Sequence, residues 1–147
     1  MPTVVILYDS RTGHTHAAAT AIAEGAALVP NVTAWLMNAE ELDLQVLADA
    51  DALAIGSPNY YTYPSGRIKT FFDLAYGQPA FKAKPFAAFS THGGGGSITP
   101  TIEKLATTLG MTRTTEGLDF LNAPAGDQLK SCRHLGTILA RAAANNP

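Results

Sequence analysis

Residues 8–16, YDSRTGHTH, combine side-chain types that can bind an anion. The hydroxyl groups can donate hydrogen bonds, and the glycine lets the backbone turn closely around a ligand. A helix that begins near His14 offers free N–H groups and the positive end of its dipole, so this chemistry suits a terminal phosphate. The candidate residues are Ser10, Arg11, Thr12, Gly13, His14 and Thr15. In a simpler interpretation Ser10 or Thr12 only caps the helix, and Arg11 is only solvated.

Two further segments have compositions that suit a flat ring. Residues 57–66, SPNYYTYPSG, put three tyrosines into four positions, on which an aromatic ligand could stack. Residues 90–97, STHGGGGS, expose backbone N–H and C=O groups and allow a planar ligand to approach closely. The candidate residues here are Pro58, Asn59, Tyr60, Tyr61, Thr91, His92, Gly93 and Gly94. In the simpler interpretations, the tyrosines cover the sheet edge or a subunit contact, and the glycines only form a mobile loop.

The elements that must position these segments alternate along the chain. Apolar runs rich in β-branched and aromatic residues predict strands at 3–8, 31–37, 50–57, 84–90 and 115–122. Helical periodicity predicts helices over 14–26, 40–49, 65–76, 97–110 and 126–140. This alternation predicts an α/β fold, a three-layer, doubly wound, five-stranded parallel sheet with helices on both faces.

In such a sheet, ligands bind beyond the carboxyl ends of the strands, at the point where strand order reverses. Residues 9–14, 57–65 and 91–97 are therefore expected to meet at one end of the sheet. The first segment suits a phosphate, the second offers aromatic faces and the third offers peptide groups. Flavin mononucleotide (FMN) has a phosphate at one end and a flat, hydrogen-bonding ring at the other, so we predict that FMN is the cofactor. The phosphate motifs G-x-G-x-x-G and G-K-[ST] are absent from the first segment.

On these motifs the chain resembles the flavodoxin-like FMN proteins. SRTGHT resembles their phosphate loop, GSPNYYTYPSGRIKTFFD the segment beside the flavin ring, and THGGGG the loop at the other edge of the ring. The resemblance extends over essentially the whole chain and implies sheet order 2-1-3-4-5 and bound FMN. The length is that of a short-chain flavodoxin. In contrast, Pro58, Gly66, Lys69, Phe71 and Asp73, together with His92 before the glycines, resemble the NAD(P)H:quinone oxidoreductases of the Trp-repressor-binding-protein type.

Three functions therefore remain open. In the first, the chain is an FMN-binding redox protein that exchanges electrons with a partner protein. In the second, it is an NAD(P)H-dependent oxidoreductase that reduces a quinone or another small molecule. The absence of aromatic residues from segment 91–97 favours the second function, because one face of the ring would stay open. In the third, it is a flavodoxin-like binding protein without FMN. Because the flavin would supply the redox chemistry, no catalytic side chain is predicted.

The composition sets the remaining expectations. The 147 residues are expected to form one domain, 1–147, and the net charge of −2 predicts no nucleic-acid surface. No apolar run reaches about 18 residues, so no membrane span is expected. The single cysteine, Cys132, is expected to be buried and unreactive, and the lack of a disulfide framework fits the cytoplasm. His14 and His16 would point apart on a helix, so no metal site is expected. A monomer and a homo-oligomer are both compatible with the sequence.

Overall fold

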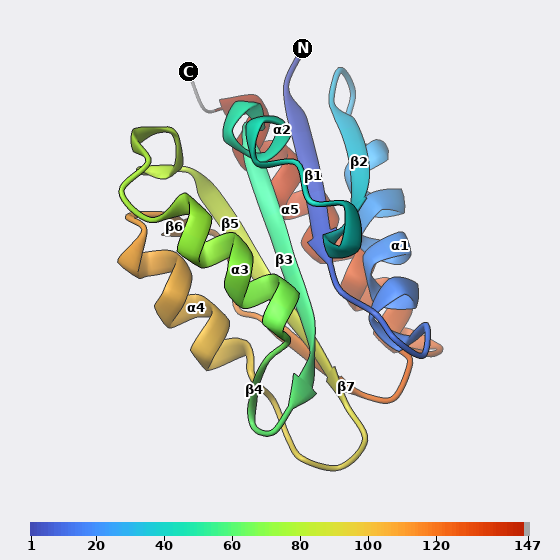
Figure 1. Cartoon of the computed structure of the whole chain (residues 1–147). Coiled ribbons are helices and arrows are strands. Elements are labelled where there is room, and N and C mark those ends of the chain that lie inside the picture. The colour runs from blue at the N-terminus through green and yellow to red at the C-terminus, as the bar shows by residue number, and fades with distance from the viewer. Residues whose placement is uncertain (146–147) are drawn as a thin grey trace.

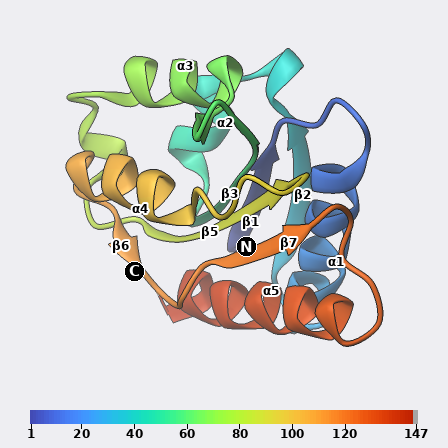
Figure 2. The ribbon, with the colours of Figure 1, turned by 90° about the horizontal axis from the view of Figure 1, so that it is seen from below.

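A central, mostly parallel sheet with helices on both faces forms the computed structural model, which describes residues 1–145 (Figure 1). Viewed along the sheet, α2, α3 and α4 lie on one side and α1 and α5 on the other (Figure 2). The strands are β1 (Thr3–Tyr8), β2 (Thr33–Asn38), β3 (Ala52–Tyr60), β4 (Tyr63–Pro64), β5 (Pro85–His92), β6 (Thr112–Arg113) and β7 (Leu118–Leu121). The helices are α1 (His14–Ala27), α2 (Leu44–Asp49), α3 (Gly66–Ala75), α4 (Thr99–Thr108) and α5 (Asp127–Asn145), with short 3₁₀ helices η1 (Ala39–Glu41) and η2 (Pro79–Phe81). The predicted α/β fold is confirmed.

The strand order is β2-β1-β3-β5-β6, and β7 also pairs with β5 in parallel. The predicted order 2-1-3-4-5 is therefore confirmed, but two short strands share the fifth position. From Phe86 to Phe89 strand β5 advances three residues, whereas its partners advance five, from Arg113 to Leu118. The two extra residues interrupt the pairing, so the strand expected over 115–122 is reduced to four residues. Gly117 lies in the break. A Cβ atom at this position would press against the side chain of Thr99 on α4 and the carbonyl oxygen of Ala88 on β5.

Strands β3 and β5 both extend further than the sequence predicts. β3 continues because β4 folds back in an antiparallel hairpin and pairs with Asn59 and Tyr60. β5 continues to His92 because β7 pairs with its last four residues. Residues 58–60 and 91–92, which were expected in loops, are therefore the last residues of strands.

Alternate residues of β1 enter two separate hydrophobic clusters. Val4 and Ile6 pack toward α1 and α5, whereas Val5 and Leu7 pack toward α2, α3 and α4. All four side chains are buried. Burial on both faces explains why β1 is apolar from Val4 to Leu7 rather than alternating.

Helices α1 and α5 approach each other closely through two glycines. A Cβ atom on Gly25 would overlap the carbonyl group of Arg133, and one on Gly136 would overlap the carbonyl group of Ile22. These two close contacts hold α1 against α5.

The long helix α5 buries one face against the sheet. Cys132, Leu135 and Leu139 are buried on this face, whereas Lys130 is exposed. Burial raises the pKa of the Cys132 thiol to about 12. Neither α5 nor any other helix within residues 1–145 has the length and apolar character needed to cross a membrane.

Candidate functional site

The carboxyl ends of β1, β3 and β5 meet at one end of the molecule, the lower end in Figure 1. There they border a cleft of about 240 Å³, next to the point between β1 and β3 where strand order reverses. The cleft is lined by Arg11, Thr12, His14, Thr15, Pro58, Asn59, Tyr60, Thr91, His92, Gly93 and Asn122. The structure thus brings together candidate residues from all three segments.

The first segment leaves the beginning of α1 open. Gly13 is the N-cap residue, and no side chain accepts a hydrogen bond from the first N–H groups of the helix. Ser10 Oγ instead accepts the N–H of Gly13 at 3.1 Å, so it shapes the loop before the helix. Gly13 has φ 94°, in the left-handed region that favours glycine. An uncapped helix N-terminus beside a cleft is suited to an anion.

Charged side chains surround this loop. The Arg11 guanidinium carbon lies 5.2 Å from the centre of the Tyr60 ring, so Arg11 connects the first and second segments. Asp9, which is 4% exposed, precedes the loop and would repel an anion. Arg67 lies 3.6 Å from Asp9 and 3.7 Å from Glu40, and its positive charge offsets theirs.

Asn59 connects the second and third segments. Its Nδ2 donates to the carbonyl oxygen of Gly96 at 2.9 Å, and its Oδ1 accepts the N–H of Thr62 at 2.8 Å. Thr62 and Tyr61 form the turn between β3 and β4, and both have positive φ, 62° and 56°. Residues with a Cβ atom rarely adopt this backbone conformation. The hydrogen bond from the Thr62 N–H to Asn59 therefore helps to hold the turn.

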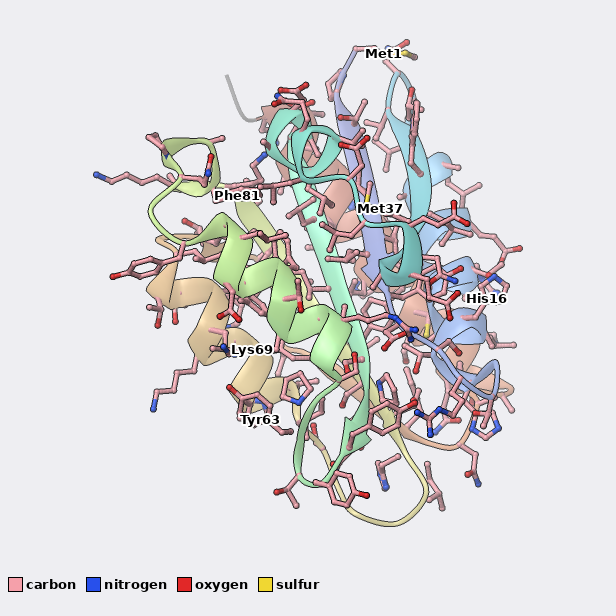
Figure 3. The ribbon with its side chains drawn as sticks, in the orientation of Figure 1. Met1, His16, Met37, Tyr63, Lys69 and Phe81 are labelled. Atoms are coloured by element: carbon pink, nitrogen blue, oxygen red, sulfur yellow. The ribbon has the colours of Figure 1, made fainter. Side chains whose placement is uncertain are left out.

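Several candidate residues lie outside the cleft lining. Ser10 and Gly13 shape the first loop, and the N–H of Gly94 donates to His92 within the third segment. The Tyr61 side chain is fully exposed. Tyr63, the third tyrosine of its segment, lies beside Lys69 of α3 (Figure 3).

Asn122 lines the cleft but was not predicted. It follows β7 with φ 61°, and its N–H donates to the carbonyl oxygen of His92 at 2.8 Å. The sequence after the fifth strand, NAPAG, has turn composition, and the carboxyl end of a fifth parallel strand reaches the same end of the sheet. These two signals together could have indicated Asn122.

The cleft therefore offers two kinds of contact. Hydroxyl and N–H groups of residues 12–15 can donate to a phosphate, and Tyr60 and the peptide groups of residues 91–93 can contact a flat polar ring. This set of groups fits a ligand that carries a phosphate and, apart from it, a flat aromatic ring. In the part of the chain that the structure describes, no three His, Cys, Asp or Glu residues come together as metal ligands.

Comparison of the sequence with known proteins shows similarity to one protein family and to curated flavodoxins. The model of the NADPH-dependent FMN reductase family matches residues 41–119. A flavodoxin from Aquifex aeolicus is 36% identical over 98 residues, which are 65% of this chain and 53% of that protein. The chain spans about half the length of the curated relatives it matches.

Solved structures match over nearly the whole chain. A flavodoxin from the domain Archaea has a TM-score of 0.89 and 28% identity, with 97% of this chain and 99% of that chain covered. A flavodoxin, WrbA-like protein from Agrobacterium tumefaciens has a TM-score of 0.75 and 27% identity, with both chains covered completely (100% and 100%).

Proposed function

Since the chain belongs to the NADPH-dependent FMN reductase family, among the flavodoxin-like FMN proteins, we propose that it is a redox protein that carries electrons through FMN held in the carboxyl-end cleft. FMN is the cofactor that this membership implies, and when bound it supplies the redox chemistry. One observation carries the placement of the cofactor. An uncapped helix N-terminus, an aromatic ring and a glycine-rich segment border the same cleft.

The residues of the first segment would hold the phosphate. Thr12 and Thr15 would donate through their hydroxyl groups, and His14 would donate through its backbone N–H at the start of α1. Each hydrogen bond to a charged group contributes about 1.5–3 kcal/mol, so a few of them give tight binding. Arg11 would add positive charge, while Ser10 and Gly13 would fix the shape of the loop.

The second and third segments would hold the two sides of the ring. Pro58, Asn59 and Tyr60 line the cleft from the second segment, and Thr91, His92 and Gly93 line it from the third. Backbone N–H and C=O groups of these residues would hydrogen-bond the polar edge of the ring. The Tyr60 ring would exclude water from part of the face of the flavin ring. Gly94 would hold its segment in place, and the exposed Tyr61 would contact a ligand only at the mouth of the cleft.

A negative charge introduced into the first segment tests this proposal. Thr12→Glu places negative charge where the phosphate would lie, so we expect the variant to lose FMN, whereas the wild type binds it and acquires a flavin absorption spectrum. Thr112→Glu is the matched control, because Thr112 is exposed on β6 near the opposite end of the sheet. Unchanged FMN binding by Thr12→Glu would show that the phosphate lies elsewhere. If the wild type stays colourless with added FMN, the remaining function is that of a flavodoxin-like binding protein without FMN.

A second function is favoured by the family and by the composition of the glycine-rich segment. Gly93–Gly96 carries no side chain that could cover a ring, which would leave room for a nicotinamide or a quinone beside the flavin. In this function the chain is an NAD(P)H-dependent reductase of quinones or similar small molecules. Steady-state NADPH consumption with a quinone distinguishes the two functions. A rate no greater than that of free FMN would remove the reductase.

We also propose a class of partner, a single domain and a location. Flavodoxin-like redox proteins work with redox partners, and here the partner would be a protein or a small-molecule acceptor such as a quinone. Both hydrophobic clusters share one sheet, which supports a single domain over residues 1–147. The unpaired, buried Cys132 suits the reducing cytoplasm.

A further inference from the structure

His92 makes two hydrogen bonds that require opposite roles of its ring nitrogens. Its Nδ1 accepts the backbone N–H of Gly94 at 2.9 Å. Its Nε2 lies 2.9 Å from Oδ2 of Asp119 on β7. Because a carboxylate only accepts, Nε2 carries the proton, and because Gly94 only donates, Nδ1 carries none. The two contacts therefore select the neutral, Nε2-protonated form of His92.

Asp119 is itself held in place by β5. The register of the sheet sets Asp119 opposite Ser90, and Ser90 Oγ donates to Oδ1 of Asp119 at 2.6 Å. Ser90 is completely buried and also accepts the N–H of Ile98 at 3.4 Å. Both oxygens of the carboxylate thus have partners, and the side chains of Asp119 and His92 are only 20% and 15% exposed. The carboxylate therefore has one orientation, and it faces the imidazole.

The glycine-rich segment depends on contacts supplied from outside it. Gly93–Gly96 has no side chains that could pack, and Gly94 and Gly96 have φ values of 134° and 90° that favour glycine. Asn59 holds the segment at Gly96, and His92 holds it at Gly94. If Nδ1 became protonated, it could no longer accept from Gly94, and this end of the segment would be released.

We propose that Asp119 is a positioning residue. It holds His92 in the Nε2-protonated form, so that Nδ1 fixes Gly94 and, with it, the glycine-rich wall of the cleft. The part of this inference that concerns cofactor affinity rests on the proposed function, whereas the part that concerns His92 and Gly94 does not. Asp119 lies outside the cleft lining and acts through His92.

Asp119→Asn tests the proposal with two readouts. The substitution keeps the shape of the side chain but gives His92 an amide that can also donate, so the preference for the Nε2-protonated form is lost. In the full chain without FMN, we expect the imidazole nitrogen chemical shifts to report a mixture of both tautomers and the Gly94 amide to exchange faster with solvent. With FMN, we expect the Kd to rise about tenfold, as for the loss of one hydrogen bond. Glu116→Gln is the control, because it removes the same charge from an exposed side chain three residues away.

A double-mutant cycle tests whether Asp119 acts through His92. His92→Asn keeps an acceptor for Gly94 but removes the group that Asp119 orients. In that background, adding Asp119→Asn is expected to change the FMN Kd by less than about twofold. Unchanged tautomer signals and Gly94 exchange in Asp119→Asn would overturn the proposal, and so would an unchanged FMN Kd despite altered tautomer signals. Failure of the wild type to bind FMN would remove the proposed function instead, and the measurements without FMN would still decide the role of Asp119.

Discussion

The side-chain hydroxyl groups of Thr15 and Thr91 lie 2.8 Å apart and are both buried, although 76 positions separate them in the sequence. Thr15 belongs to the first turn of α1, and Thr91 belongs to the end of β5. Their hydrogen bond joins the start of α1, on one side of the cleft, to the end of β5 beside the glycine-rich segment. The same contact that lines the cleft therefore also holds two of its walls together.

Thr15→Val is expected to destabilise the fold without changing its shape. Valine has the size of threonine but cannot hydrogen-bond, so the buried Thr91 hydroxyl would lose its partner at a cost of about 1–3 kcal/mol. Urea unfolding of the protein without FMN measures this, since a bound ligand would add its own stabilisation. Thr20→Val is the control, because Thr20 bonds only the carbonyl group of His16 at an exposed site of the same helix. Equal losses in the two variants would contradict the expectation.

Gly136→Ala is expected to force α1 and α5 apart. The added methyl group would overlap the carbonyl group of Ile22, which belongs to backbone and cannot turn aside. Overpacking of this kind costs about 1–3 kcal/mol, and the Tm should fall accordingly. Gly66→Ala is the control, since an added Cβ there meets nothing within 4 Å and alanine is the better helix former. A Gly136→Ala variant as stable as Gly66→Ala would show that the helices are less closely packed.

Lys84 is expected to be essential for the stability of α2. It is 5% exposed, and its Nζ donates to the carbonyl groups of Leu47, Ala48 and Ala50 at the end of that helix. Burial lowers the pKa of Lys84, and the nearby carboxylates act in the opposite direction. Lys84→Met fills the space but leaves these carbonyl groups unpaired, so unfolding should become easier by at least about 2 kcal/mol. Lys82→Met, at an exposed position, should change the free energy of unfolding far less.

Cys132 is expected to make stability depend on alkaline pH. Burial raises the pKa of its thiol from 9.0 to about 12, so the unfolded chain loses this proton before the folded one does. The protonated thiol therefore stabilises the folded chain fully below pH 9, and this stabilisation falls as the pH rises from 9 to about 12. The free energy of unfolding, measured over this pH range, should therefore fall more steeply for the wild type than for Cys132→Ala.

Thiol labelling gives an independent test of the same burial. At pH 8 a thiol reagent should label Cys132 in urea but leave the folded chain unlabelled, because the thiolate is the nucleophile and Cys132 is buried. Equal labelling rates with and without urea would mean that Cys132 is accessible in the folded chain.

The sequence alone predicts those elements whose signal is local. β1 has the predicted bounds because every residue from Val4 to Tyr8 is buried. Helix α4 has Pro100 in its first turn, and Gly110 follows its end with φ 88°, as its sequence indicates. Local composition also indicates the three segments that border the cleft. The alternation of strands and helices predicts a parallel sheet, whereas the order of its strands is what the resemblance to flavodoxin-like proteins implies.

Features that depend on distant partners could not be predicted in this way. The last residues of β3 and β5 are strand only because β4 and β7 pair with them. Asp119 has no motif of its own, and its contact with His92 exists only through the register of β7 on β5. The sequence around Tyr60 and Tyr61 gives no sign that one lines the cleft and the other is exposed. The difference arises because Tyr60 ends β3, whereas Tyr61 has positive φ in the turn that follows.

The interruption between β6 and β7 also affects how this rim of the sheet meets other molecules. A long, continuous outer strand presents a row of free backbone donors and acceptors on which a foreign strand can assemble into fibrils. Here that row is divided into lengths of two and four residues with the register shifted between them. An incoming strand cannot follow both lengths at once, so the interruption protects this side of the protein against aggregation.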